Sequence, residues 1–175
     1  MAKMNKILVV VDMQNDFVSG SLGSEDAKAI VGNVANKIEN WQDDIVCTYD
    51  THYENYLETR EGKMLPVEHC IENTDGWQLC REVEKALKGK EYKTFRKPTF
   101  GSEELAAFLK EGRYDEIHFI GLCTDICVIS NVMLTKAALP ESEIVVHKDC
   151  CAGVTTESHE NALNAMKMCH IQIEN

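Results

Sequence analysis

The chain has 175 residues, of which 44% are hydrophobic and 27% are charged, the proportions of a single soluble globular domain with a sizeable core. Its formal net charge of −11 argues against a nucleic-acid-binding protein, which would carry a basic patch, and against docking on an anionic membrane surface. The apolar run at 7–11 is too short for a signal peptide or a membrane span. We therefore expect a cytoplasmic protein whose eight cysteines stay reduced.

Six short apolar segments have the length and composition of β-strands. The first, at 6–12, is a continuous β-branched run, which is typical of a parallel strand buried on both faces. The other strands are expected at 45–50, 92–97, 116–121, 143–147 and 170–174.

Helical patterns separate most of these strands. An apolar stripe with a period near 3.6 residues predicts a helix that begins after Ser24. The connections at 13–23 and 51–74 are expected to be loops, and a loop as long as the second is usually functional or packed by its own side chains. Strands and helices that alternate in this way predict βαβ units and a mostly parallel sheet. Further helices are expected at 75–88, 102–111, 125–138 and 157–168, with N-caps at Ser102 and at Thr155 or Thr156, and with Gly89 and Gly112 as stops.

Reactive side chains stand where four of the predicted strands end. Asp12 ends the first strand, Asp50 the second and Lys97 the third. The fourth strand leads through Gly121 to Cys127, near the start of a helix. Because ligands of open α/β sheets bind beyond the carboxyl ends of the strands, we expect these side chains to meet there.

An acid, a lysine and a cysteine together suit the chemistry of an activated thiol. The thiolate is the nucleophilic form of cysteine, and both a helix N-terminus and the Lys97 ammonium would stabilise it at Cys127. Asp12 would take the thiol proton and later return it to a leaving amine. Free backbone N–H groups at 123–127 would hold a developing oxyanion.

Three stretches of the chain resemble the signature sequences of the isochorismatase-like cysteine hydrolases, a superfamily that includes the nicotinamidases. They are DMQNDF at 12–17, KPTFG at 97–101 and GLCTDICV at 121–128. The resemblance spans essentially the whole chain in order and spacing. It implies a single hydrolase domain over 1–175 with a Rossmann-like, three-layer α/β/α fold and a six-stranded, mostly parallel sheet.

The resemblance also implies roles for individual residues. Asp12, Lys97 and Cys127 would form the catalytic triad, and the backbone amides of Cys123 and Cys127 would form the oxyanion hole. A cis peptide bond is implied just before Cys123. The substrate pocket would be lined by Phe17, Phe100 and Leu65, the last of which stands where relatives often have a tryptophan.

A metal site is implied by the same resemblance. Nicotinamidases hold a metal with an aspartate, a histidine two residues later and further histidines, which here implies Asp50, His52 and His69. Tyr56 stands in place of the usual middle histidine, and Glu61 is a further candidate ligand. Zinc, iron or manganese would suit this mixture of nitrogen and oxygen ligands, and no organic cofactor is expected. The alternative for these residues is a polar network without metal.

The function implied by the resemblance is hydrolysis of a small amide through a thioester on Cys127, with release of ammonia or an amine. The substrate would be nicotinamide, another aromatic amide or a ureido compound, and the enzyme would be a homo-oligomer, either a dimer or a tetramer. Two alternatives remain open: a non-catalytic member that binds a small ligand, and a thiol redox sensor built on Cys123 and Cys127. The vinyl-ether branch of the superfamily does not need the cysteine that is present here.

Overall fold

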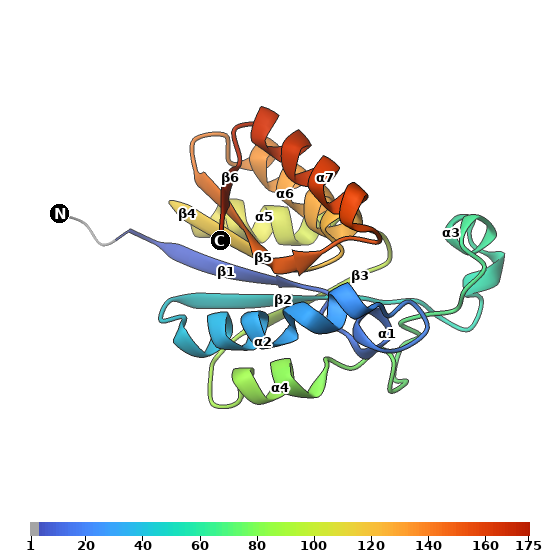
Figure 1. Ribbon diagram of the computed structural model, residues 1–175. Coiled ribbons are helices and arrows are strands. Elements are labelled where there is room, and N and C mark those ends of the chain that lie inside the picture. The colour runs from blue at the N-terminus through green and yellow to red at the C-terminus, as the bar shows by residue number, and fades with distance from the viewer. Residues whose placement is uncertain (1–3) are drawn as a thin grey trace.

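The computed structural model describes residues 4–175, in which a six-stranded sheet lies between two layers of helices (Figure 1). The predicted domain also includes residues 1–3, which lie outside the described part of the chain. The sheet order is β3-β2-β1-β4-β5-β6, and every neighbouring pair is parallel. The predicted three-layer α/β/α fold is therefore confirmed, with a sheet that is wholly parallel. The strands are β1 (Lys6–Val11), β2 (Asp44–Asp50), β3 (Lys93–Lys97), β4 (Glu116–Leu122), β5 (Glu143–Ala152) and β6 (Gln172–Glu174).

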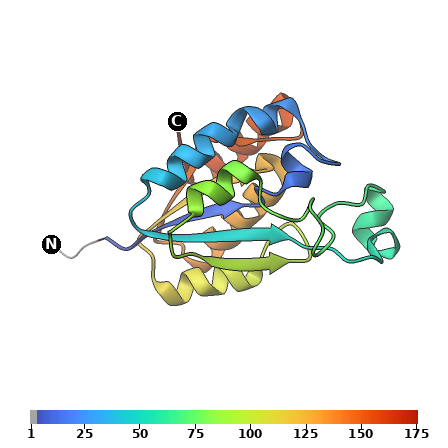
Figure 2. The same ribbon diagram turned by 90° about the horizontal axis from the view of Figure 1, so that it is seen from below.

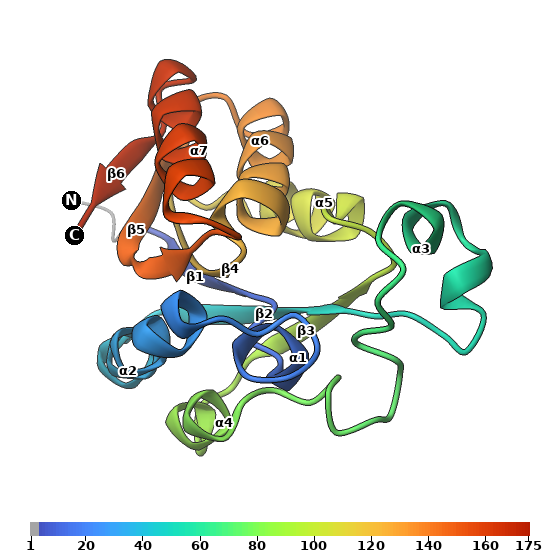
Figure 3. The ribbon, with the colours of Figure 1, turned by 45° about the vertical axis from the view of Figure 1, so that its right-hand side comes forward.

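In the described part of the chain, seven α-helices and two short turns of other helical types connect the strands. One face of the sheet is covered by α1, α2 and α4, and the other by α5, α6 and α7 (Figures 1 and 3). The helices are α1 (Asn15–Val18), α2 (Glu25–Asn40), α3 (Arg60–Met64), α4 (Arg81–Leu87), α5 (Glu103–Gly112), α6 (Ile129–Ala138) and α7 (Thr156–Met168). The 3₁₀ turn is η1 (Tyr56–Glu58), and the π-helical turn is η2 (Thr124–Val128).

The central strand β1 explains why its sequence is apolar without interruption. Leu8 and Val10 pack into the core on the α2 side, whereas Ile7, Val9 and Val11 pack into the core under α5, α6 and α7. Since successive side chains of a strand point to opposite faces, a strand covered on both sides buries all of them.

The helix predicted at 75–88 begins only at Arg81, so this prediction is wrong for 75–80. The backbone of this segment pairs instead with the loop that follows β1, and Gln14 and Leu79 form an antiparallel bridge. Three backbone hydrogen bonds join the two segments: the N–H of Asn15 donates to the carbonyl of Gln78 at 2.8 Å, that of Asp16 to the carbonyl of Gly76 at 3.0 Å, and that of Cys80 to the carbonyl of Met13 at 2.8 Å. They use backbone groups that a helix would need for its own hydrogen bonds.

Other boundaries differ from the sequence predictions in smaller ways. The loop predicted at 13–23 contains α1, and the long loop at 51–74 contains η1 and α3, which extend beyond the carboxyl ends of β2 and β3 (Figure 2). The helix α5 ends at Gly112, and its C-cap is Arg113, which adopts the left-handed conformation with φ 51°. The predicted N-caps Ser24, Ser102 and Thr155 are confirmed, since each side chain accepts a backbone N–H of its helix. The strand β5 continues to Ala152 rather than ending at 147, and the helix predicted at 125–138 begins as η2.

All eight cysteines are free thiols, and six of them are buried. Across residues 4–175, none of the helices combines the length and the apolar character that a membrane span requires.

Candidate active site and metal centre

Four strands deliver the predicted reactive residues to one edge of the sheet. Asp12 directly follows β1, Asp50 is the last residue of β2 and Lys97 is the last residue of β3. Cys127 lies in the turn η2 after β4, which is the neighbour of β1. Between β1 and β4 the strand order reverses, and this reversal is where open α/β sheets bind their ligands.

The backbone at the ends of β1 and β4 depends on one glycine. Gly121 has φ 120°, and a Cβ atom added there would lie 2.0 Å from the carbonyl oxygen of Val11. A side chain at this position would therefore force the two strands apart. Asp12, just beyond Val11, takes the left-handed conformation with φ 47°, which aspartate tolerates better than most residues. The close contact at Gly121 thus brings the end of β1, and with it Asp12, beside the end of β4, which leads into the turn that carries Cys127.

The Lys97 ammonium lies at the centre of the site and joins the other members. Its Nζ atom is 2.6 Å from Oδ2 of Asp12, 3.4 Å from Sγ of Cys127 and 3.4 Å from Oδ1 of Asp50. It also donates a hydrogen bond to the carbonyl of Thr99 at 3.1 Å. The structure thus brings together the three residues predicted as a triad.

Burial and mutual charge set the protonation of these groups. Burial lowers the pKa of Lys97, but Asp12, Cys127 and Asp50 together outweigh it and the net pKa is well above the ordinary value, so the amine stays charged. Burial raises the pKa of Asp12, with Lys97 opposing the rise. Burial also raises the pKa of Cys127 well above the ordinary value, against the influence of Lys97. Lys97 thus acts on the Cys127 thiol in the predicted direction, but burial outweighs it, and the thiol stays protonated at rest beside a carboxylate with raised proton affinity.

The turn η2 shapes the backbone around Cys127. The carbonyl of Cys123 accepts hydrogen bonds from the N–H groups of Ile126 at 3.1 Å and Val128 at 3.0 Å, the two residues on either side of Cys127. The Asn131 side chain donates to the Cys127 carbonyl at 2.8 Å, which anchors the far side of the turn. The Leu122–Cys123 peptide bond is cis, as the sequence resemblance implied.

Two residues that the sequence did not single out hold Asp50 and Asp12 in place. The buried Gln14 side chain donates to the carbonyls of Asp50 at 2.9 Å and Trp77 at 2.8 Å, and it accepts the N–H of Asp50 at 2.8 Å. The Thr48 hydroxyl donates to Oδ1 of Asp12 at 2.6 Å. Strand alternation places Thr48 on the same face as Asp50 and could have indicated it. Gln14 lies within the DMQNDF stretch, but no local signal indicates its bonds to Asp50, which is 36 residues away.

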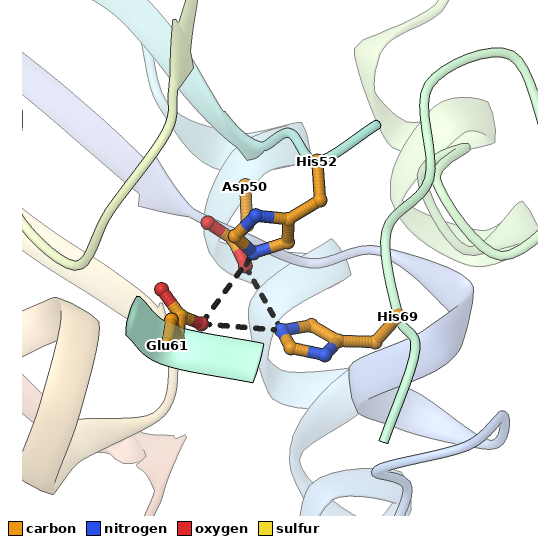
Figure 4. A group of neighbouring side chains, drawn as sticks. All are labelled: Asp50, His52, Glu61 and His69. Atoms are coloured by element: carbon orange, nitrogen blue, oxygen red, sulfur yellow. Dashed lines mark hydrogen bonds and ion pairs between the residues drawn. The ribbon is translucent and has the colours of Figure 1, made fainter. Parts of the chain in front are cut away.

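Asp50 also belongs to a second cluster, with His52, Glu61 and His69 (Figure 4). One ligand atom from each residue lies within 4.8 Å of all the others. The Nε2 atom of His52 is 3.0 Å from Oδ2 of Asp50 and 3.5 Å from Oε1 of Glu61. The Nε2 atom of His69 is 3.4 Å from the same Asp50 oxygen and 3.6 Å from the same Glu61 oxygen. The structure therefore brings all four predicted metal ligands together, Glu61 included.

The donor set of this cluster fits a divalent transition metal. The Nδ1 atom of His69 is hydrogen-bonded to the Val67 carbonyl at 2.8 Å, which requires Nδ1–H and leaves Nε2 free as a ligand in the neutral ring. Burial lowers the pKa of His52, but Asp50 and Glu61 outweigh it and raise that pKa to about 9, so the site attracts positive charge. Two imidazole nitrogens and two carboxylate oxygens suit zinc, iron or manganese.

Tyr56 forms a wall of this cluster. Its ring packs against His52 and His69 with centroids 4.7 and 5.0 Å apart, and its hydroxyl donates to the carbonyl of Leu65. Burial raises the pKa of Tyr56 to about 12, so the phenol stays neutral. The packing of Tyr56 thus positions the two histidines.

The three predicted pocket residues differ in their surroundings. Phe17 is buried, and its ring centroid is 5.5 Å from that of His69. Leu65 and Phe100 are 38% and 43% exposed, in the segments that follow α3 and β3 respectively. Of the three, only Phe17 is buried beside the metal-ligand cluster.

Comparisons with known proteins agree with this geometry. The family model described as the isochorismatase domain matches residues 6–174. The isochorismatase family protein PncA of Bacillus subtilis is 30% identical, over 92% of this chain and 93% of its own length. A crystal structure of nicotinamidase/pyrazinamidase PncA from Bacillus subtilis has a TM-score of 0.81 at 29% identity and covers 98% of this chain and 100% of that chain. The pyrazinamidase of Pyrococcus horikoshii in complex with zinc has a TM-score of 0.83 at 26% identity and covers 97% of this chain and 98% of that chain.

Proposed function

The chain belongs to the isochorismatase family, and from this we propose that it is a nicotinamidase-like cysteine amidohydrolase with a single catalytic domain. Its substrate would be a small amide, with nicotinamide and pyrazinamide as the first candidates because similar proteins are described as nicotinamidases and pyrazinamidases. The observation that carries the proposal is the buried Lys97 ammonium in contact with both the Asp12 carboxylate and the Cys127 sulfur.

The first half of the reaction would form a thioester. Asp12 takes the proton of the Cys127 thiol as the sulfur attacks the amide carbonyl. The raised pKa of Asp12 makes this carboxylate a better proton acceptor, and the raised pKa of Cys127 keeps the proton on sulfur until the attack. The backbone amides of Cys123 and Cys127 receive the oxyanion of the tetrahedral intermediate. Asp12 then gives the proton to the leaving nitrogen, the C–N bond breaks and ammonia or an amine departs.

The second half would reverse these proton movements with water as the nucleophile. Asp12 takes a proton from the water as the water oxygen attacks the thioester carbonyl. The intermediate collapses, the C–S bond breaks, and the proton held by Asp12 returns to Cys127. The Lys97 ammonium stays charged and balances the negative charge that passes between Asp12 and the sulfur.

The metal would be held by Asp50, His52, Glu61 and His69. When bound, zinc, iron or manganese would supply a Lewis acid for a polar atom of the substrate. Asp50 is common to both clusters, since Oδ1 faces Lys97 and Oδ2 faces the two histidines. This shared carboxylate connects the proposed metal centre to the lysine that contacts the nucleophile.

The structure argues against the two other functions considered for the sequence. Redox-sensor cysteines have low pKa values and are accessible to solvent, whereas Cys127 is 5% exposed and burial raises the pKa of Cys123 to about 12. A protein that only binds a ligand has no need of a lysine buried between Asp12 and the sulfur.

Ammonia release from nicotinamide, pyrazinamide and a panel of small aromatic amides and ureido compounds tests the proposal. Intact-mass spectrometry of rapidly quenched mixtures should show a transient acyl adduct, and peptide mapping should place it on Cys127. Cys127→Ser is the matched control and should give neither ammonia nor a thioester. Turnover by Cys127→Ser at the wild-type rate, or no ammonia from any compound in the metal-loaded protein, would contradict the proposed function.

A further inference from the structure

His159 contacts the catalytic turn from a different part of the chain. It lies in the first turns of α7, and its Nδ1 atom is 2.7 Å from the hydroxyl oxygen of Thr124. Thr124 is fully buried and is the first residue of η2. Within residues 4–175 its hydroxyl has no other hydrogen-bond partner, so His159 alone satisfies this buried group.

The start of α7 is itself held firmly in place. Thr155 and Ser158 form a capping box at its N-terminus. A Cβ atom added to Gly153 would lie 2.9 Å from both the backbone nitrogen and the Cβ of His159, so only glycine allows the end of β5 to pass this close. The Asp125 carboxylate accepts the N–H of Val154 with both oxygens at 3.2 Å. Consecutive residues of η2 are thus attached to the segment that leads into α7.

Thr124 lies between the two backbone amides that would form the oxyanion hole. It directly follows Cys123, and Cys127 lies one turn further along. The bond from His159 therefore holds the side chain of a residue that lies between these two amides. An oxyanion hole depends on such fixed donors, because donors that must reorganise during the reaction stabilise the developing charge less well.

We propose that His159 is a positioning residue that acts through Thr124 to hold the backbone amides of Cys123 and Cys127 where they receive the oxyanion. This proposal rests on the amidohydrolase function proposed above. His159 does not touch the reacting atoms in this arrangement, and its effect is confined to steps in which negative charge develops on the substrate oxygen.

Three measurements on His159→Ala separate this role from a merely structural one. The kcat for the best amide should fall roughly tenfold with KM nearly unchanged, because the donors remain but are less well placed. Nicotinaldehyde, which forms a hemithioacetal with the thiol and places an oxyanion in the same hole, should bind roughly tenfold more weakly. Alkylation of Cys127 by iodoacetamide needs no oxyanion hole, so its rate should stay at the wild-type value.

Companion variants keep the test sharp. Thr124→Val should reproduce the loss, and the double variant should lose no more than either single one, whereas independent effects would multiply to roughly a hundredfold. His159→Asn, whose amide can take the place of Nδ1, should recover most of the activity. Asn161→Ala, at an exposed position of the same helix, is the control and should behave as wild type.

The outcomes distinguish this proposal from the one on which it rests. If wild type releases no ammonia from any amide, the proposed function fails. If wild type turns over and His159→Ala matches it in kcat and in aldehyde affinity, the role of His159 alone is refuted. A fall in alkylation rate parallel to the fall in kcat would also refute it, because a general loss of site structure would then explain both.

Discussion

Replacing Lys97 with methionine removes the charge of the ammonium and keeps a side chain of similar length. The Nζ atom lies 3.4 Å from Sγ of Cys127. At an effective dielectric constant of about 20, two unit charges at that distance interact by about 5 kcal/mol. This energy corresponds to about 3 to 4 pH units in the pKa of the thiol. Since the ammonium favours the thiolate, its loss must raise the pKa of Cys127 further.

Part of that rise will be offset by Asp12. Without Lys97 its carboxylate is protonated more readily and repels the thiolate less, so we expect a net rise of at least about one unit. The assay is the rate of iodoacetamide alkylation against pH, with peptide mass spectrometry to follow Cys127 alone. The midpoint should move to higher pH in Lys97→Met and stay in place in Lys93→Met, an exposed change on the same strand.

The folded state of Lys97→Met must be verified in the same experiment. The substitution leaves the buried carboxylates of Asp12 and Asp50 without their common partner, which costs about 3–5 kcal/mol of unfolding free energy. Circular dichroism at each pH gives the folded fraction. An alkylation midpoint equal to that of wild type in folded Lys97→Met would refute the electrostatic role assigned to this lysine.

Three further predictions concern the residues around Lys97. Asp12→Asn should abolish ammonia release while the near-ultraviolet circular dichroism stays native, because the amide cannot accept the thiol proton; normal turnover would exclude Asp12 as the base. Glu61→Gln should lower the metal content of protein purified without chelator, measured by elemental analysis, whereas the exposed change Glu58→Gln should not; equal metal content in both would remove Glu61 from the ligand set. Gln14→Leu should lower the unfolding free energy by about 2–3 kcal/mol in urea titrations, because the buried backbone N–H and carbonyl of Asp50 lose their hydrogen-bond partner. A loss of unfolding free energy no larger than that of Gln78→Ala, a change at an exposed position, would contradict this.

The sequence predicts the sheet and the meeting of its reactive residues well, for a physical reason. A parallel strand buried on both faces must be apolar throughout, so the point where the apolar run stops at Asp12 marks the strand end. All strands of a parallel sheet end at the same edge, and so Lys97 and Cys127 could be placed beside Asp12 without knowledge of any distance.

What the sequence could not reveal depends on contacts between distant segments. The segment 75–80 has a helical apolar pattern, but it pairs with the loop after β1, and no local signal records that partner. Gln14 is part of the same pairing and bonds to Asp50 from 36 residues away. The protonation of Cys127 depends on a related kind of information, since the lysine that lowers its pKa is visible in the sequence whereas the depth of burial that outweighs this lysine is not.

The six buried thiols of this chain can be used to measure local unfolding. Cys47 lies in β2, Cys151 in β5, and Cys70 directly follows a proposed metal ligand, so they sample separate parts of the fold. A bulky thiol reagent can reach a buried cysteine only when its surroundings open, and the labelling rate then reports the free energy of that local opening. Each of these cysteines can therefore serve as a native reporter of local unfolding, with no probe attached.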